Sequence, residues 1–199
     1  MADILIVYAS LEGQTRKICC RTANKLQRQG HNVSVLDAHT DGEMPDAIDG
    51  AIIAGPIHYE KHDDKLVQFL ADHKDRLAAI PTAFVTVSLS AGSKDQKERD
   101  AAKAITNDLL DHVGLAPAMK LQAAGAVHDD KLGFFKRMML HRILRQKGVT
   151  PDASGHTEFT DWKSCDAFVN HFVREHVPER RKASLARKPQ TVQTETRLA

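Results

Sequence analysis

The sequence predicts an α/β domain built on a doubly wound, five-stranded parallel sheet with helices on both faces. Five short apolar runs recur along the 199 residues, separated by segments long enough for a helix. Three of the runs are almost continuously apolar, as expected of strands whose two faces are both covered by helices. Regular alternation of strand and helix is typical of a parallel sheet. The expected strands are residues 4–8, 33–36, 50–54, 83–87 and 119–123.

The expected helices carry their apolar side chains along one face, with the 3.6-residue period of an amphipathic helix. The first helix follows the first strand and ends at Gly30, and the fourth ends at Gly114. The last helix begins with Thr160 or Asp161 as its N-cap and ends near Pro178. Residues 39–49 have no such stripe and are expected to be mostly loop. The alternating second and fifth strands suit the edges of the sheet.

Charge is distributed unevenly, although the net charge is only +2. Residues 129–147 and residues 178–199 each hold six basic and two acidic side chains, so the remainder is acidic. Basic segments on an acidic body suggest an anionic partner, although simple solvation of those segments is an equal alternative. We expect one domain over residues 1–177, with an insertion at 128–159, and a polar, disordered tail at 178–199.

The three cysteines predict a reduced, cytoplasmic protein. Cys19 and Cys165 fall on apolar helix faces, where buried thiols are expected, and Cys20 lies one step off that face. No signal peptide is apparent, and no apolar run approaches the roughly 20 residues of a membrane span. Any membrane contact is therefore expected to be peripheral. No metal ligand set and no nucleic-acid partner are predicted, and a homo-oligomer is left open.

A candidate phosphate site follows the first strand. There a hydroxyl- and glycine-containing loop leads directly into a helix, whose N-terminus favours an anion. Glycine lets the backbone approach a ligand closely, and hydroxyls can donate to it. The alternative is a plain turn with Thr15 as a helix cap. The candidate residues are Ser10, Leu11, Glu12, Gly13, Gln14 and Thr15.

Two further loops leave the third and fourth strands, at residues 55–60 and 88–94. Ligands of open α/β sheets bind beyond the carboxyl ends of the strands, so all three loops are expected to meet. Tyr59 or His58 could lie against a flat ring, although an exposed loop histidine is equally expected at position 58. Backbone amides of the later loop could meet the edge of that ring. The candidates are Ile57, His58, Tyr59, Ser88, Leu89, Ser90 and Gly92.

These motifs together resemble the flavodoxin-like FMN proteins, and in more detail the quinone-dependent protoporphyrinogen dehydrogenases of bacteria. The resemblance covers roughly residues 3–176. It includes a long basic insertion before the last helix, which that group also has. The matching motifs are the loop Glu12-Gly13-Gln14-Thr15-Arg16, the run Ile57-His58-Tyr59, the approach Arg76-Leu77 to Pro81, the run Ala124-Gly125-Ala126, and Phe159-Thr160-Asp161-Trp162.

The resemblance implies a flavodoxin-like sheet of strand order 2-1-3-4-5, with FMN bound by the three loops and near Gly125. It implies the six-electron oxidation of protoporphyrinogen IX to protoporphyrin IX, with electrons passed to a membrane quinone, commonly menaquinone. It also implies peripheral association with the inner face of the cell membrane. This chain departs from that group at three places. His58 stands where the group usually has a basic residue before the tyrosine, and Glu60 stands where it has a glycine. The loop at residues 90–94, which contains arginine in the group, has none here.

The insertion is the segment that separates this interpretation from its alternatives. A basic, partly amphipathic helix there would suit an anionic membrane surface or the propionates of a porphyrin, and packing on the body is the alternative. A flavodoxin-type electron carrier should lack such a segment, and a flavodoxin-like quinone reductase is a further alternative. No general base is assigned, and His58 is the nearest candidate. The candidate substrate or membrane residues are Lys131, Phe135, Lys136, Arg137, Arg142 and Arg145.

Overall fold

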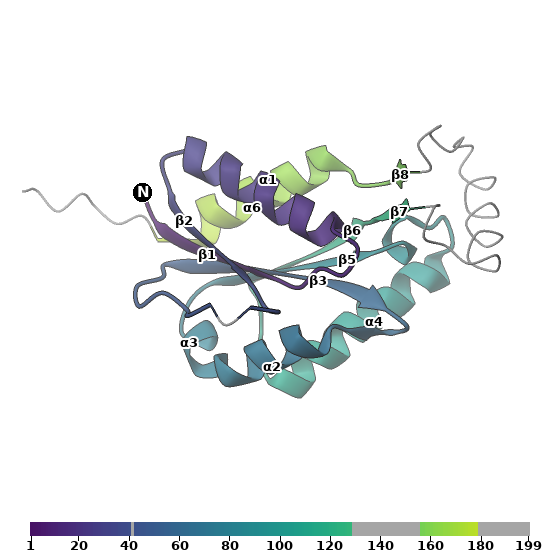
Figure 1. The fold of residues 1–199 in the computed structure, drawn as a ribbon, viewed down its shortest axis with the longest axis horizontal. Coiled ribbons are helices and arrows are strands. Elements are labelled where there is room, and N and C mark those ends of the chain that lie inside the picture. The colour runs from purple at the N-terminus through teal and green to yellow at the C-terminus, as the bar shows by residue number, and fades with distance from the viewer. Residues whose placement is uncertain (41, 129–155, 179–199) are drawn as a thin grey trace, which may run out of the picture.

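A computed structural model of the chain describes residues 1–40, 42–128 and 156–178. Its centre is a sheet in which the five predicted strands are parallel and lie in the predicted order (Figure 1). Register places Ile4 opposite Gly50 and Ala83 opposite Met119. Across the sheet the strands are β2 (Asn32–Asp37), β1 (Asp3–Tyr8), β3 (Gly50–His58), β5 (Thr82–Ser88) and β6 (Met119–Ala124).

Helices cover both faces of this sheet, which explains the continuous apolar strands. In β1 the side chains of Ile4 and Ile6 belong to one buried cluster, and those of Leu5 and Val7 belong to the other. The first cluster lies under α1 (Gln14–Arg28) and α6 (Trp162–His176). The second lies under α2 (Asp64–Asp72), α3 (Lys74–Ala78) and α4 (Gln96–Val113).

The helix ends follow their sequence signals. Asp161 is the N-cap of α6, and its carboxylate accepts hydrogen bonds from the backbone N–H groups of Lys163 and Ser164. Gly114 ends α4 in a left-handed conformation with φ of 72°. The segment after β3 and β4 forms two helices, α2 and α3, which meet at His73. Residues 39–49 form no helix or strand where they are described.

Two small strand pairs were not predicted. β4 (Lys61–His62) returns antiparallel beside the end of β3, and β7 (Ala126–His128) pairs antiparallel with β8 (His156–Glu158). The second pair lies at the two ends of the insertion, where the sequence shows no strand signal. Residues 129–155 and 179–199, which hold the predicted helix and most of the predicted tail, lie outside the described residues.

Buried thiols are confirmed at Cys19 and Cys165, whereas Cys20 is exposed. Burial raises the pKa of Cys19 well above its ordinary value and raises that of Cys165 to about 11. Both side chains are therefore neutral core groups. Within the described ranges, no helix is both long enough and apolar enough to cross a membrane.

Candidate functional site

The loop between β1 and α1 has the backbone geometry of an anion site. Gly13 precedes α1 with φ of 90°, a conformation that favours glycine. The hydroxyl oxygen of Ser10 accepts hydrogen bonds from the backbone N–H groups of Gly13 and Arg16, at 3.1 and 3.3 Å, and so fixes the loop. Other N–H groups here donate to no acceptor in the described part of the chain, namely those of Leu11, Glu12, Gln14 and Thr15.

Side chains of the same loop point in different directions. The amide of Gln14 turns towards the β8–α6 region, where it donates to Glu158 Oε1 at 2.6 Å and to Thr160 Oγ1 at 2.8 Å. Gln14 therefore contributes to the loop through its backbone. Thr15 is buried, and its hydroxyl remains a predicted phosphate donor. A phosphate would thus be held mainly by backbone N–H groups and by the positive end of α1.

The second predicted loop is a tight hairpin between β3 and β4. Ile57 pairs with His62 and His58 with Lys61, which leaves Tyr59 and Glu60 as the two turn residues. Both have positive φ, 49° and 62°, as a type I′ turn requires. The hairpin presents the ring of Tyr59 to solvent, with 84% of its surface exposed. His58 makes no side-chain hydrogen bond with a described residue, so nothing described orients it as a general base.

His62, on the returning strand of this hairpin, was not singled out from the sequence. Its ring is only 4% exposed and meets the ring of Phe84 edge to face, with centroids 5.5 Å apart. Burial lowers the pKa of His62 to about 4, and the backbone of Pro56 opposes that shift only in part. The side chain is therefore a neutral group that packs the hairpin against Phe84 of β5. Its polar neighbours in sequence gave no sign of this burial.

The third loop follows β5 and begins with one turn of 3-10 helix, η1 (Ser90–Gly92). The hydroxyl of Ser88 accepts from the backbone N–H of Ala91, and the carbonyl of Leu89 accepts from that of Gly92. Gly125, after β6, donates its N–H to the Ser88 carbonyl at 3.1 Å. The predicted residues of this loop and Gly125 are therefore directly connected.

Exposed apolar side chains gather on these three loops. In the described chain five large apolar residues are exposed, and three of them are Leu11, Tyr59 and Leu89, one on each loop. The loops leave β1, β3 and β5, which are adjacent parallel strands, so their carboxyl ends meet at one edge of the sheet. Single exposed apolar residues are ordinary, but a group at a strand-end edge is typical of a site for a flat apolar ligand.

The residues that lead from the insertion into α6 are hydrogen-bonded to this edge of the sheet. The hydroxyl of Thr160 donates to the Ala124 carbonyl at 2.7 Å, and the N–H of Phe159 donates to the Gly125 carbonyl. Glu158 accepts from both Gln14 and Lys17. The predicted substrate or membrane residues of the insertion itself, all between 131 and 145, lie outside the described residues. In the ranges that are described, no group of His, Cys, Asp and Glu side chains could hold a metal ion.

Comparison with known proteins places this arrangement in a family. Residues 5–154 match the flavodoxin domain, a stretch that includes all three loops. The chain belongs to the flavodoxin domain family. This membership and the observed sheet confirm the predicted flavodoxin-like fold, and FMN is the cofactor that the family implies. The residues present fit that cofactor, since unpaired N–H groups for a phosphate lie on the same edge as exposed apolar side chains for a ring system.

Two relatives of this flavodoxin-family chain share most of its length. Protoporphyrinogen IX dehydrogenase (quinone) of Escherichia coli strain K12 is 27% identical over 172 residues, covering 86% of this chain and 92% of the relative. The Leishmania major protein of the same name is 26% identical over 190 residues, covering 93% and 81%. Oxidised flavodoxin 1 from Bacillus cereus superposes with a TM-score of 0.53 at 15% identity, covering 87% of this chain and 99% of that one, which supports the fold alone.

Proposed function

We propose that this flavodoxin-family chain is an FMN-dependent oxidoreductase that oxidises protoporphyrinogen IX and passes the electrons to a membrane quinone. The observation that supports it best is the edge where unpaired backbone N–H groups lie beside the exposed side chains of Leu11, Tyr59 and Leu89. The substrate is proposed from the two relatives, which match this chain over most of its length.

In this proposal each loop has a separate task. The β1–α1 loop binds the FMN phosphate, Tyr59 packs against a face of the flavin ring, and the backbone of residues 88–92 meets its edge. When bound, FMN supplies the redox chemistry, and the chain positions it and excludes water. The ring loops lack arginine, so the substrate propionates are assigned to the insertion, at Lys131, Lys136, Arg137, Arg142 and Arg145, with Phe135 against the porphyrin or the acyl boundary.

The decisive experiment is an anaerobic assay of the FMN-loaded protein with protoporphyrinogen IX and menaquinone, read by porphyrin fluorescence. We expect porphyrin to form only when protein, FMN and quinone are all present. A protein that binds FMN and exchanges electrons with redox partners, yet forms no porphyrin, would be an electron carrier. Reduction of quinone by a nicotinamide donor without porphyrin formation would instead identify a quinone reductase.

A second experiment tests the insertion. A variant with residues 129–147 replaced by a short Gly/Ser linker should fold and bind FMN, but should lose protoporphyrinogen oxidation. Unchanged porphyrin formation would contradict the role proposed for this segment.

Since the proposed acceptor is a membrane quinone, the proposal includes peripheral association with the inner face of the cell membrane.

A further inference from the structure

Helix α1 is unusually basic for a protein whose remaining body is acidic. It contains five basic residues and no acidic one. Four of them follow one another at intervals of four, four and three residues, so they lie along one side of the helix. These four residues, called here the α1 basic row, are Lys17, Arg21, Lys25 and Arg28.

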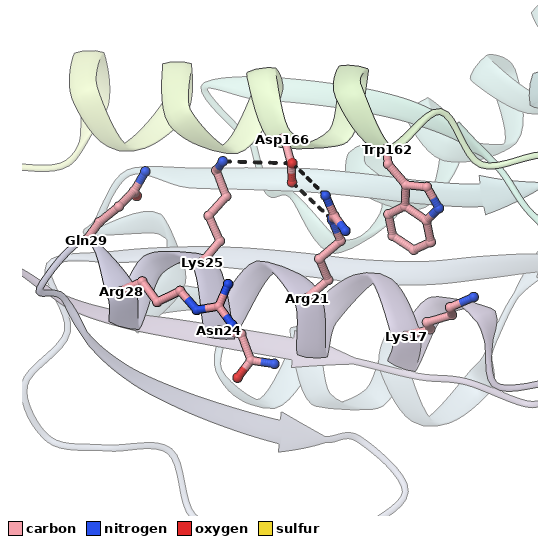
Figure 2. A pocket seen from close by; sticks show the side chains of 8 residues that line it. All are labelled: Lys17, Arg21, Asn24, Lys25, Arg28, Gln29, Trp162 and Asp166. Carbon is pink, nitrogen blue, oxygen red and sulfur yellow. Dashed lines mark hydrogen bonds and ion pairs between the residues drawn. The ribbon is translucent and has the colours of Figure 1, made fainter.

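The α1 basic row lines a groove of about 710 Å³ between α1 and α6 (Figure 2). From α6, Trp162 and Asp166 face the row. The Trp162 ring centroid lies 5.5 Å from Lys17 Nζ and 5.1 Å from the Arg21 guanidinium. None of the predicted loop residues lines this groove, so it is separate from the candidate flavin site.

The groove keeps a surplus of positive charge. Asp166 pairs with Arg21 at 2.9 Å and lies 3.8 Å from Lys25, and it is the only acidic residue in the lining. Arg28 has no ion pair with any residue in the described ranges. Most of the row is well exposed, with 53% of the Lys17 side chain and 50% of the Arg21 side chain accessible. An anionic group can therefore approach without displacing protein.

The position of the groove favours an extended anionic surface over a small ligand. The two helices run in the same direction, because Lys17 pairs with Glu158 just before α6 begins, and Gln29 bonds to Asn170 further along at 2.9 Å. Beyond Glu158, through β8, the chain connects to residues 129–147, and beyond the other end of α6 it continues into residues 178–199. Each of these segments has six basic residues in the sequence, and both lie outside the described residues except for Pro178. Within the described chain, the α1 basic row itself extends along the length of the groove.

We propose that the face formed by α1 and α6 docks onto anionic phospholipid membranes, with lipid phosphates in the groove beside the α1 basic row. The inference rests on the proposed function in one respect, the membrane quinone as acceptor. Basic side chains gather at an anionic surface by electrostatic attraction that salt screens, and tryptophan suits the boundary between water and lipid.

Binding of the FMN-loaded full-length protein to vesicles tests this proposal. The vesicles contain equal parts phosphatidylglycerol and phosphatidylcholine, with pure phosphatidylcholine as reference. The test variant is Lys25→Gln with Arg28→Gln, which leaves the Arg21–Asp166 pair and the flavin loops intact. The matched control is Lys97→Gln with Lys103→Gln on α4, which covers the opposite face and includes a comparable ion pair, Lys103 with Asp100.

The test variant should bind the anionic vesicles about tenfold more weakly, and the control should bind as the wild type does. Trp162 is the only tryptophan of the chain, so its fluorescence should respond to anionic vesicles and recover at high salt. Equal losses in both variants, or no loss in the test variant, would overturn the proposal. So would displacement by inorganic phosphate beyond that by chloride at equal ionic strength, which indicates a discrete phosphate site.

The outcome is separable from that of the proposed function. The test variant should retain FMN and should oxidise protoporphyrinogen with a water-soluble quinone at the wild-type rate. If the wild type forms no porphyrin but its vesicle binding still depends on Lys25 and Arg28, the docking face stands without that activity. If the activity is present but vesicle binding does not depend on Lys25 and Arg28, the proposed docking face is wrong.

Discussion

The side-chain amide of Gln14 donates a 2.6 Å hydrogen bond to the carboxylate of Glu158, 144 positions later in the chain. Glu158 also accepts from Lys17 at 2.9 Å, and Gln14 donates to Thr160 as well. The first turn of α1 and the strand that closes the insertion are therefore fixed to one another. Burial opposes ionisation of Glu158, but the hydrogen bonds from Lys17 and Gln14 hold its pKa below the ordinary value.

Replacing Glu158 should cost stability. In Glu158→Ala the Gln14 amide and the Lys17 ammonium both lose an acceptor, so the free energy of unfolding should fall by about 1–2 kcal/mol. Glu175→Ala is the matched control, because among the described residues Glu175 forms an ion pair only with its exposed neighbour Arg174, and a loss of about 0.5 kcal/mol or less is expected there. Urea denaturation measures both losses. Equal losses would mean that the Glu158 contacts stabilise the fold no more than an exposed ion pair does.

Stability should depend on pH through His62. Its folded-state pKa is about 4, below the roughly 6.5 expected of an unfolded chain. The buried neutral ring stabilises the fold fully above about pH 6.5. As pH falls towards 4 the unfolded chain takes up the proton first, so about 3 kcal/mol is lost across that window.

Two substitutions separate this contribution from other titrating groups. His62→Phe should flatten the pH dependence of the unfolding free energy between about pH 7 and pH 4. His112→Gln, at an exposed position on α4, should leave the dependence as it is in the wild type. A wild-type slope in the His62 variant would show that this ring is not the group responsible.

Glycine should be favourable at position 60. Glu60 has φ of 62°, where a side chain costs roughly 1 kcal/mol, so Glu60→Gly should raise the free energy of unfolding by about 0.5–1 kcal/mol. Lys61→Gly, in the adjacent strand position, should instead lower it by about 0.5–1 kcal/mol. Thermal or urea unfolding of both variants checks the opposite signs, and a loss in both would argue against the strained turn.

Two of the predicted cofactor glycines should respond differently to alanine. Gly13 has φ of 90°, so Gly13→Ala should distort the anion loop and weaken FMN binding about fivefold to thirtyfold. Gly125 does not have a left-handed φ, and an added methyl group there would meet Val87 at 3.5 Å and the Ser88 backbone at 3.8 and 4.0 Å, all ordinary contact distances. Gly125→Ala should therefore bind FMN almost as the wild type does. Titration of apoprotein with FMN, read by flavin fluorescence, tests the contrast.

Most of the sheet could be predicted from the sequence, because its strands are marked by composition and its helix ends by residue type. Gly114 and Asp161 illustrate the second signal, as both end or begin a helix where expected. The β3–β4 hairpin could not be predicted. Its turn uses Tyr59 and Glu60, whereas type I′ turns usually favour asparagine and glycine, so no turn signal was present.

The sequence indicates which three loops form the candidate site, but not which of their side chains are hydrogen-bonded to other parts of the chain. Sequence spacing indicates which strand a loop follows, and parallel strands then bring the loops together. It cannot indicate that Gln14 turns away to bond Glu158, since that contact depends on where the chain returns after the insertion. The groove beside α6 was missed for the same reason. The α1 basic row is visible in the sequence, but its neighbour Trp162 is distant along the chain.

The paired ends of the insertion have an evolutionary consequence. His128 lies opposite His156 in the β7–β8 ladder, so the connection between these two residues begins and ends on adjacent strands. Closing a chain between such neighbours costs only slightly more as the connection grows, because the entropy of loop closure rises with the logarithm of length. Descendants of this domain could therefore lengthen, shorten or exchange that connection without changing the register of the main sheet.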